Sequence, residues 1–365
     1  MPSGGIDPGR LARVRAATQL LHRPASASNP AEIARSIAGA QAQDVYAGPL
    51  TFRSRSRRLT AADVTGARTE DRSLLRTWVM RMTIHMIPTD DVGWWLPLFE
   101  PGIERWSRRR LSQLGLPEDK QDRALRVAAK ALADEGPLTR SDVRERIVRT
   151  GIVLNSQTGM HIALTSVVSG IACLGPDRGA ESCLVRREDW LGKPPPFDRE
   201  RALAELTRVY IRAFAPATDR DFAYWSGLPL RDVRAGLSSI STEIEEVRVG
   251  DEVMLSPRGG LPRLPRTGQV RMLGNFDTYL LGWKDRAFSV SGEHALHVKE
   301  GGGGWIRPVI VEDGIVVGGW RTARKAGRLE ISLNLPKAER ERLGPAIEAE
   351  VADIERFEGT EARIA

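Results

Sequence analysis

The sequence predicts an α+β protein with three tandem winged-helix units, each a helix-turn-helix with a β-hairpin wing. These units surround a small C-terminal antiparallel β-barrel, and a C-terminal helix ends the chain. Three observations lead to this prediction. A short T-x-x-D signal recurs at equal spacing, helical and then strand-like segments follow it, and strand patterns dominate after residue 269. With 365 residues the chain is longer than one hydrophobic core usually serves.

The recurring T-x-x-D signal begins at Thr60, Thr139 and Thr218, and successive threonines are 79 positions apart. Each Thr is suited to cap the N-terminus of a helix, and the Asp three positions later is suited to complete a capping box. Equal spacing of a structural signal indicates repeated units of similar size.

The segments around the second and third signals have the same order of elements. Amphipathic stretches at 119–134 and 198–214 come before them, and β-hairpins are predicted at 171–185 and 245–256, the latter turning at Gly250-Asp251. Three helices followed by a hairpin are typical of a winged helix. We place the three units at 8–115, 116–195 and 196–258, and the first is the least regular.

The rest of the chain changes character. Residues 259–268 read as a linker, and strands are predicted within 269–335, including 270–283, 286–290 and 294–300. The Asp313-Gly314 pair between two apolar runs predicts a type I′ hairpin turn. We therefore expect the small barrel at 269–335 and the closing helix at 336–360.

The charge of the chain favours nucleic acid as a partner. The net charge is +7, and only seven of the 54 basic residues are Lys. Arginine grips phosphate bidentately, although GC-rich codon usage also enriches Arg. The cluster "TFRSRSRRLT" (51–60) makes Arg53, Arg55 and Arg57 candidate DNA contacts.

The location follows from what the composition excludes. A run of about 18 apolar residues is missing, so no membrane partner is expected. Two cysteines, Cys173 and Cys183, cannot staple a chain of this length, and a reducing cytoplasm is the simple interpretation.

Three motifs resemble the winged-helix DNA glycosylases, the AlkZ-like and YcaQ-like family. "MLGNFDTYLLGWKDR" (272–286) resembles its F-D-x-Y-L-L-G-x-x-D-R signature, and "LLRTWVMRMTIHMI" (74–87) resembles its W-x-x-R-x-T-x-H segment. "QAQ" (41–43) is similar to the Q-x-Q motif of the AlkZ-like branch, since the other branch has Asp where Gln43 stands. The resemblance implies tandem winged helices around a β-barrel, a DNA-binding face and a barrel hairpin that probes the DNA near the lesion.

Gln41 and Gln43 are the candidate catalytic residues. A glutamine amide does not titrate near pH 7, but it offers one acceptor and two N–H donors. Two amides can hold a water at the anomeric carbon. Holding the water suffices for hydrolysis only if the base is already a good leaving group, as an N7-alkylated purine is. Side chains two apart share a face in extended chain and diverge in a helix, so the hypothesis requires 41–43 to be non-helical. The alternative is that both are polar residues at the end of a helix. Asp44 is expected to cap the next helix.

Two further segments supply candidate DNA contacts. Arg81, Thr83 and His85 alternate and would share a face on one strand, and Arg76 adds charge nearby. They either contact DNA or form the solvated face of that strand. In the glycine-rich region, His297 and Lys299 are candidates on the probing hairpin, which could equally be solvated. The H-x-x-H pattern at 294–297 is a poor zinc site, because on a strand the two His would face opposite sides.

These observations favour a monofunctional DNA glycosylase that hydrolyses the N-glycosidic bond of N7-alkylated purines in double-stranded DNA. Interstrand crosslinks and bulky natural-product adducts are candidate substrates, with repair or self-resistance as the purpose. We expect a monomer in the bacterial cytoplasm, at the nucleoid, without a metal or other cofactor. The alternative is a non-catalytic winged-helix DNA-binding protein, either a transcriptional regulator or a lesion binder.

Overall fold

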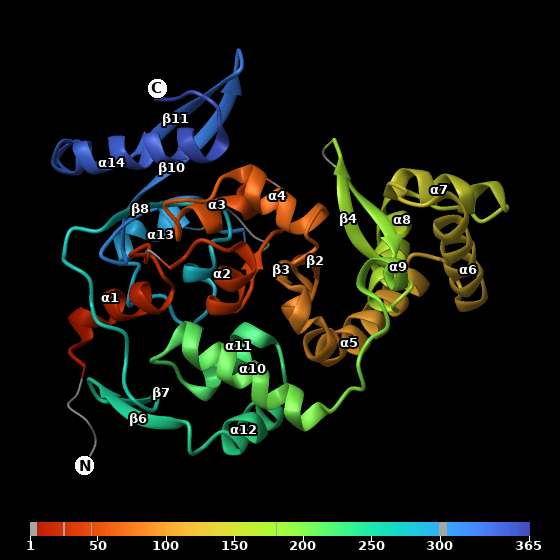
Figure 1. Ribbon diagram of the computed structural model, residues 1–365, viewed down its shortest axis with the longest axis horizontal. Coiled ribbons are helices and arrows are strands. Elements are labelled where there is room, and N and C mark those ends of the chain that lie inside the picture. Colours follow the sequence, from red (N-terminus) through yellow and green to blue (C-terminus); the bar gives the residue numbers. More distant parts are fainter. Residues whose placement is uncertain (1–5, 25, 45, 180, 299–304) are drawn as a thin grey trace. The chain divides into compact units, whose positions relative to one another are not determined.

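The computed structural model describes residues 6–24, 26–44, 46–179, 181–298 and 305–365. Two compact units make up the chain (Figure 1). The first combines Met1–Thr65 with Leu203–Ala365, and the second is Gly66–Ala202. Among the helices of the described residues, none is both long and apolar enough to cross a bilayer.

The first unit begins with short helices and ends with a sheet and a long helix. Its N-terminal part contains α1 (Pro8–Thr18), α2 (Pro30–Ser36), β1 (Ala40–Gln41), α3 (Ala47–Arg53) and the start of α4 (Ala61–Thr69). Its middle part contains α10 (Arg199–Phe214), α11 (Asp219–Ser226), α12 (Leu230–Ser239), β6 (Ile244–Val249) and β7 (Glu252–Pro257). Its C-terminal part contains β8 (Val270–Leu273), η3 (Thr278–Leu280), η4 (Gly292–His294), α13 (Ala295–Val298), β9 (Val309–Glu312), β10 (Ile315–Lys325), β11 (Arg328–Asn334), α14 (Lys337–Glu358) and β12 (Ala362–Ile364).

The second unit holds one sheet and five helices among the described residues. Its elements are β2 (Leu74–Trp78), η1 (Met80–Met82), β3 (Ile84–Pro88), η2 (Thr89–Asp91), α5 (Val92–Gln113), α6 (Glu118–Glu135), α7 (Arg140–Arg149), α8 (Ser156–Val168), β4 (Ala172–Arg178), β5 (Glu181–Arg186) and α9 (Arg187–Leu191). Its four strands lie in the order β3-β2-β4-β5 with antiparallel neighbours.

The T-x-x-D signals are helix caps, as predicted. At each of the three sites the Thr hydroxyl accepts from the backbone N–H of the Asp, and the Asp carboxylate accepts from the backbone N–H of the Thr. The helices that begin there are α4, α7 and α11. The order of three helices and a hairpin is also observed, in α6–α8 with β4–β5 and in α10–α12 with β6–β7.

The C-terminal sheet is an open, curled half-barrel, where a small antiparallel β-barrel was predicted. Its strands lie in the order β12-β11-β10-β9-β8, so β8 and β12 are edges. The predicted type I′ turn is confirmed, because Asp313 and Gly314 both have positive φ and Glu312 pairs with Ile315. The last strand, β12, runs parallel to β11, which a purely antiparallel sheet would not contain.

The closing helix α14 covers one face of this sheet, and Figure 1 shows it beside the long β10–β11 hairpin. Trp320 and Ile331 from the hairpin pack with Leu343, Ile347 and Ile354 from the helix in one buried cluster. Burial of this apolar surface is what fixes the hairpin to the helix.

Two of the predicted C-terminal strands are absent from the described residues. Residues 286–290 form turns, and 294–298 are helical in η4 and α13. The "HALHV" pattern also fits a helix, in which His294 and Val298 lie four apart on one side while Leu296 is exposed. The strand predicted at 270–283 ends at Leu273, and the side chain of Asp277 then caps η3.

Candidate active site and DNA-contacting residues

The Q-x-Q segment lies outside any helix. Helix α2 ends at Ser36, and the backbone N–H of Gly39 donates to the carbonyl of Ala34 at 2.7 Å. Ala38 and Gly39 both have positive φ, so the chain leaves the helix in a left-handed turn that Gly39 makes without strain. Ala40 and Gln41 are then extended. The backbone therefore meets the condition that the shared-water hypothesis sets.

The two glutamines occupy different environments. Gln41 is only 5% exposed, whereas Gln43 is exposed to solvent. The Oε1 atom of Gln41 is buried and has no hydrogen-bond partner among the described residues. An unpaired buried acceptor costs free energy, and a substrate or water that donates to it would remove that cost. Gln41 therefore offers an inner acceptor and Gln43 an outer amide on the same short segment.

Asp44 fixes the end of this segment to two other parts of the first unit. Its Oδ1 accepts from the backbone N–H groups of Tyr46 at 2.9 Å and Ala47 at 3.2 Å. Asp44 therefore holds the backbone at the start of α3, although the N-cap position itself is Tyr46 and not Asp44 as predicted. Its Oδ2 accepts from Nδ2 of Asn275 at 3.2 Å. The Oδ1 atom of Asn275 is a second buried acceptor without a hydrogen-bond partner in the described part of the chain. Sequence reasoning missed Asn275, although it stands within the quoted 272–286 motif.

A hollow of about 560 Å³ opens beside Asp44 and Asn275. It is lined by Ala47 and Leu50 of α3, by the face of β10 that carries Trp320, and by the end of α14. Its size is within the range of sites that hold small organic molecules.

The F-D-x-Y-L-L-G motif supports the site from behind. The Oγ1 of Thr278 donates to the carbonyl of Gly39 at 3.3 Å, at the turn that leads into Gln41. The hydroxyl of Tyr279 donates to the carbonyl of Gly314 at 2.7 Å, and burial raises the pKa of this phenol. The motif therefore positions the Q-x-Q turn and does not itself face a ligand through these two side chains.

Arg53 and Arg55 are core residues, which corrects their assignment to the DNA-contacting set. Both are fully buried. Arg53 pairs with Glu350 at 3.0 Å and Asp353 at 3.1 Å, and Arg55 holds Asp277 through two contacts of 2.8 and 2.9 Å. Guanidinium groups that are paired and shielded in this way are not available to phosphate. Arg57, two residues on, is exposed and remains a candidate contact.

The 74–87 segment is a hairpin and not a single strand, so the predicted shared face is wrong. Arg81 lies in the η1 turn with φ of 53°, while His85 lies in β3. Arg76 is buried in β2 and donates to the Ser182 hydroxyl at 2.7 Å. His85 is buried, and desolvation lowers its pKa to about 3, so the ring is neutral. Of this predicted set, Arg81 and Thr83 are partly exposed.

The predicted hairpin probe around His297 is a short helix. His297 is half-buried in α13, its Nδ1 lies 3.3 Å from Nδ2 of Asn334, and desolvation lowers its pKa. Lys299, predicted beside it, lies outside the described residues. The prominent hairpin of this region is instead β10–β11, with Arg324, Lys325 and Arg328 near its turn.

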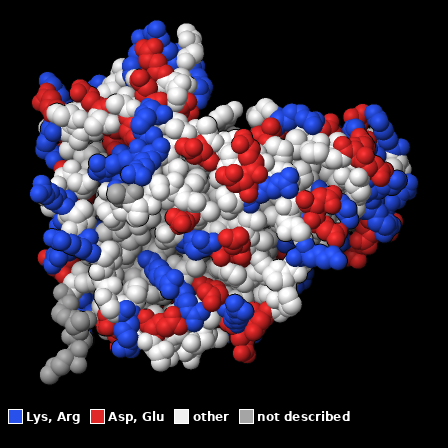
Figure 2. All heavy atoms as spheres, in the orientation of Figure 1, with Lys and Arg blue, Asp and Glu red and all other residues white. Residues whose placement is uncertain are grey.

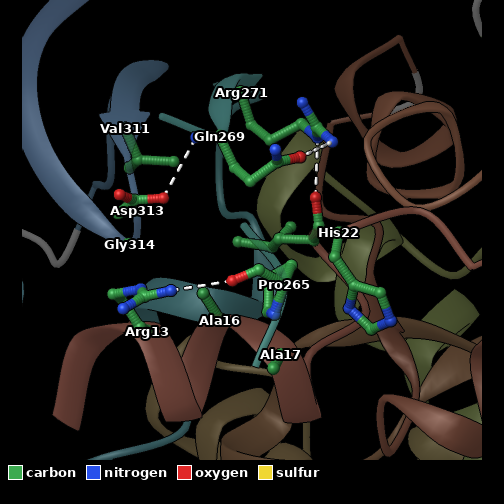
Figure 3. A pocket seen from close by; sticks show the side chains of 11 residues that line it. Arg13, Ala16, Ala17, His22, Pro265, Gln269, Arg271, Val311, Asp313 and Gly314 are labelled. Carbon is green, nitrogen blue, oxygen red and sulfur yellow. Dashed lines mark hydrogen bonds between the residues drawn. The ribbon is translucent and has the colours of Figure 1, made fainter. Parts of the chain in front are cut away.

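A second cavity, shown in Figure 3, has room for about one water molecule. Arg13 donates to the Pro265 carbonyl at 2.7 Å on one side of it, and Arg271 donates to the Leu21 carbonyl at 2.6 Å on another. Nδ1 of the neighbouring His22 is buried without a hydrogen-bond partner in the described chain. A bound water suits this cavity, and a nucleobase does not fit it.

Charge is mixed on the visible face. Figure 2 shows Lys and Arg interspersed with Asp and Glu, and surface pairs such as Arg146–Glu135 and Arg342–Glu312 account for part of this pattern. The 54 basic residues therefore overstate the number of cations that are available to phosphates.

Comparisons with known proteins agree with one another. The family model described as "DNA glycosylase AlkZ-like" matches residues 34–357. The interstrand DNA cross-link repair glycosylase of Streptomyces sahachiroi is 28% identical over 309 residues, which cover 79% of this chain and 80% of that protein. The solved structure of the Streptomyces sahachiroi DNA glycosylase AlkZ superposes with a TM-score of 0.76 at 24% identity, covering 99% of this chain and 100% of the other. The match of the family model across most of the sequence shows that this chain belongs to the AlkZ-like DNA glycosylase family.

Proposed function

We propose that this protein is a monofunctional DNA glycosylase that releases N7-alkylated purines, with interstrand crosslinks and bulky adducts among its substrates. The observation that carries the proposal is the buried Oε1 of Gln41, which has no hydrogen-bond partner in the described part of the chain and lies on a non-helical Q-x-Q segment. Membership of the AlkZ-like family and the name of the crosslink-repair relative support the same assignment.

In the proposed reaction a water attacks the anomeric carbon as the purine departs. An N7-alkylated purine is already cationic, so it leaves without a general acid and the sugar acquires oxocarbenium character. The Gln41 carbonyl accepts a hydrogen bond from the water, and the Gln43 amide holds it from the outer side. Because neither amide can protonate a leaving base, an ordinary neutral purine stays in place. The N7-alkylated purine leaves with the electron pair of the glycosidic bond and so becomes neutral, and the proton that the attacking water loses passes to the solvent. Positioning and electrostatics are the whole contribution of the two side chains.

We further propose that the two three-helix-and-hairpin segments, α6–α8 with β4–β5 and α10–α12 with β6–β7, act as winged helices on duplex DNA, together with a less regular unit at 8–115. Arg57 and Arg81 are the proposed phosphate contacts from the predicted set, since both have exposed surface. The Q-x-Q segment contains no Lys that could form a Schiff base with the sugar, so the proposed product is an abasic site.

The test uses duplex DNA that carries N7-methylguanine, with the uncatalysed depurination subtracted. The wild-type protein should release the base and leave sites that break only on alkali treatment. Gln41→Ala and Gln43→Ala should each lower the single-turnover rate by about 100-fold. Gln113→Ala, an exposed glutamine at the end of α5, is the matched control and should keep the wild-type rate. Tight binding of undamaged DNA without base release would refute the proposal in favour of a non-catalytic DNA-binding protein.

A further inference from the structure

The hollow beside Asp44 and Asn275 has walls from three elements of the first unit. Strand β10 presents Trp320, Thr322 and Arg324, which alternate along the strand and therefore face the same side. Leu50 of α3 and Glu358 of α14 face them. Ala323 lies between Thr322 and Arg324 and points to the opposite face of the strand.

This hollow begins where the proposed catalytic segment ends. Asp44 directly follows Gln43 and lines the hollow, and its carboxylate is held by the N–H groups that start α3 and by Asn275. Asn275 also lines the hollow, with its Oδ1 buried and lacking a hydrogen-bond partner among the described residues. The hollow therefore adjoins the proposed catalytic segment along the chain.

The lining has the composition of a site for a largely apolar organic group. Leu50, Pro308, Trp320 and Ile354 supply apolar surface. The Trp320 ring is fixed, because its indole N–H donates to the Leu273 carbonyl at 2.9 Å. At the hairpin end, Arg324 and Glu358 form an ion pair at 2.9 Å, which bounds the space with polar groups. Apolar walls with a few placed polar groups are typical of sites that select small molecules.

Tyr46 adds an aromatic ring at the mouth. This residue also lines the hollow, and 66% of its surface is exposed. A ring this exposed contributes little to the packing of the core, and it offers a face on which a planar group can stack.

We infer that this hollow receives the substituent carried on N7 of the excised purine, and that Thr322 and Tyr46 are specificity-determining residues for its size and shape. The inference rests on the proposed function, because it takes the purine to lie at Gln41 and Gln43. A methyl substituent leaves a space of about 560 Å³ almost unfilled, whereas a fused aromatic group occupies a large part of it. Among the bulky adducts of the proposed function, those whose N7 substituent is planar and mainly apolar therefore fit this lining best.

The test compares two duplexes, one with N7-methylguanine and one with N7-(naphthylmethyl)guanine, and reports the ratio of kcat/KM for the bulky lesion to that for the small one. Thr322→Phe places a ring in the hollow from an exposed strand position and should lower this ratio about 10- to 200-fold. Ala323→Phe adds the same ring to the other face of β10 and is the matched control, with the wild-type ratio expected. Tyr46→Ala removes the stacking surface and should also lower the ratio. Because Tyr46 is exposed, this substitution should leave the stability of the fold almost unchanged.

The outcomes separate the two proposals. If the wild-type protein releases neither base, the proposed function fails. If it releases both and Thr322→Phe and Tyr46→Ala keep the wild-type ratio, the hollow does not hold the substituent and this inference is overturned. An equal fall in both rates for Thr322→Phe also overturns it, since the space would then serve the base or the DNA backbone common to both substrates.

Discussion

The buried pair of Arg55 and Asp277 allows a sharp test of whether the basic cluster at 51–60 serves the fold or the DNA. Both side chains are completely buried, and two contacts of 2.8 and 2.9 Å join the guanidinium to the carboxylate. Arg55→Ala leaves the carboxylate of Asp277 buried with the Ser54 hydroxyl and the Tyr279 N–H as its remaining donors. Removing one partner of a buried ion pair costs about 3–5 kcal/mol of folding free energy.

The loss of folding free energy in Arg55→Ala can be measured from the thermal and urea unfolding of the first unit. At about 2–4 °C per kcal/mol for a unit of this size, Arg55→Ala should lower the Tm by roughly 10 °C, and urea should unfold the variant at a clearly lower concentration. Arg55→Lys keeps a cation but loses the two-pronged geometry, so its loss should be intermediate. Arg57→Ala, at the exposed neighbouring position, should change the free energy of unfolding by less than about 0.5 kcal/mol.

In measurements of DNA affinity, Arg57→Ala and not Arg55→Ala should be the variant with the direct effect. Arg57→Ala should weaken binding to duplex DNA and lower the dependence of affinity on salt, because one phosphate contact is lost. If Arg55→Ala unfolded at the wild-type urea concentration while its DNA affinity fell, the assignment of Arg55 to the core would be refuted.

Two further predictions concern the fold. His85 has a pKa of about 3 when folded and near 6.5 when unfolded, so its neutral form contributes stability that is present above pH 6.5 and is lost as the pH falls toward 3. Between pH 6 and 5, His85→Leu should therefore reduce the slope of unfolding free energy against pH by up to about 1.4 kcal/mol per unit, and an unchanged slope would contradict the burial of the ring. Thr218→Ala removes the hydroxyl that accepts from the Asp221 N–H and should cost about 1 kcal/mol in urea unfolding, with Thr65→Ala, away from any cap, as a control expected to cost less.

The features that the sequence predicted well are those with local causes. The capping boxes at Thr139 and Thr218 involve residues three apart, and the turn at Asp313-Gly314 depends on the positive φ that these two residue types tolerate. Helix α14 was predicted from its own periodicity. In each case the interactions that decide the structure lie within a few residues, where a sequence pattern can display them.

The features that it could not predict depend on distant partners. Arg55 and Asp277 are 222 positions apart, and Arg53 is 297 positions from Glu350, so a dense run of Arg and Ser looked like a phosphate-binding surface. The parallel pairing of β12 with β11 likewise follows the long helix α14 and has no local signal. For Asn275, the available signal is its place two positions before Asp277 in the 272–286 motif, but its contact with Asp44 spans 231 positions.

The arrangement around the Q-x-Q segment links the choice of chemistry to the choice of substrate. The Asp44 carboxylate, the nearest acid in sequence, accepts hydrogen bonds from the backbone N–H groups of Tyr46 and Ala47 and from the side chain of Asn275, and these contacts fix its position. In the proposed reaction no side chain of the segment removes a proton from water, and the positive charge of the leaving group supplies the driving force. The alkyl group that creates this charge is also the group that the further inference places in the hollow beside Asp44. Under these two proposals, the turn from Gln41 to α3 would select a lesion both by its charge and by its size.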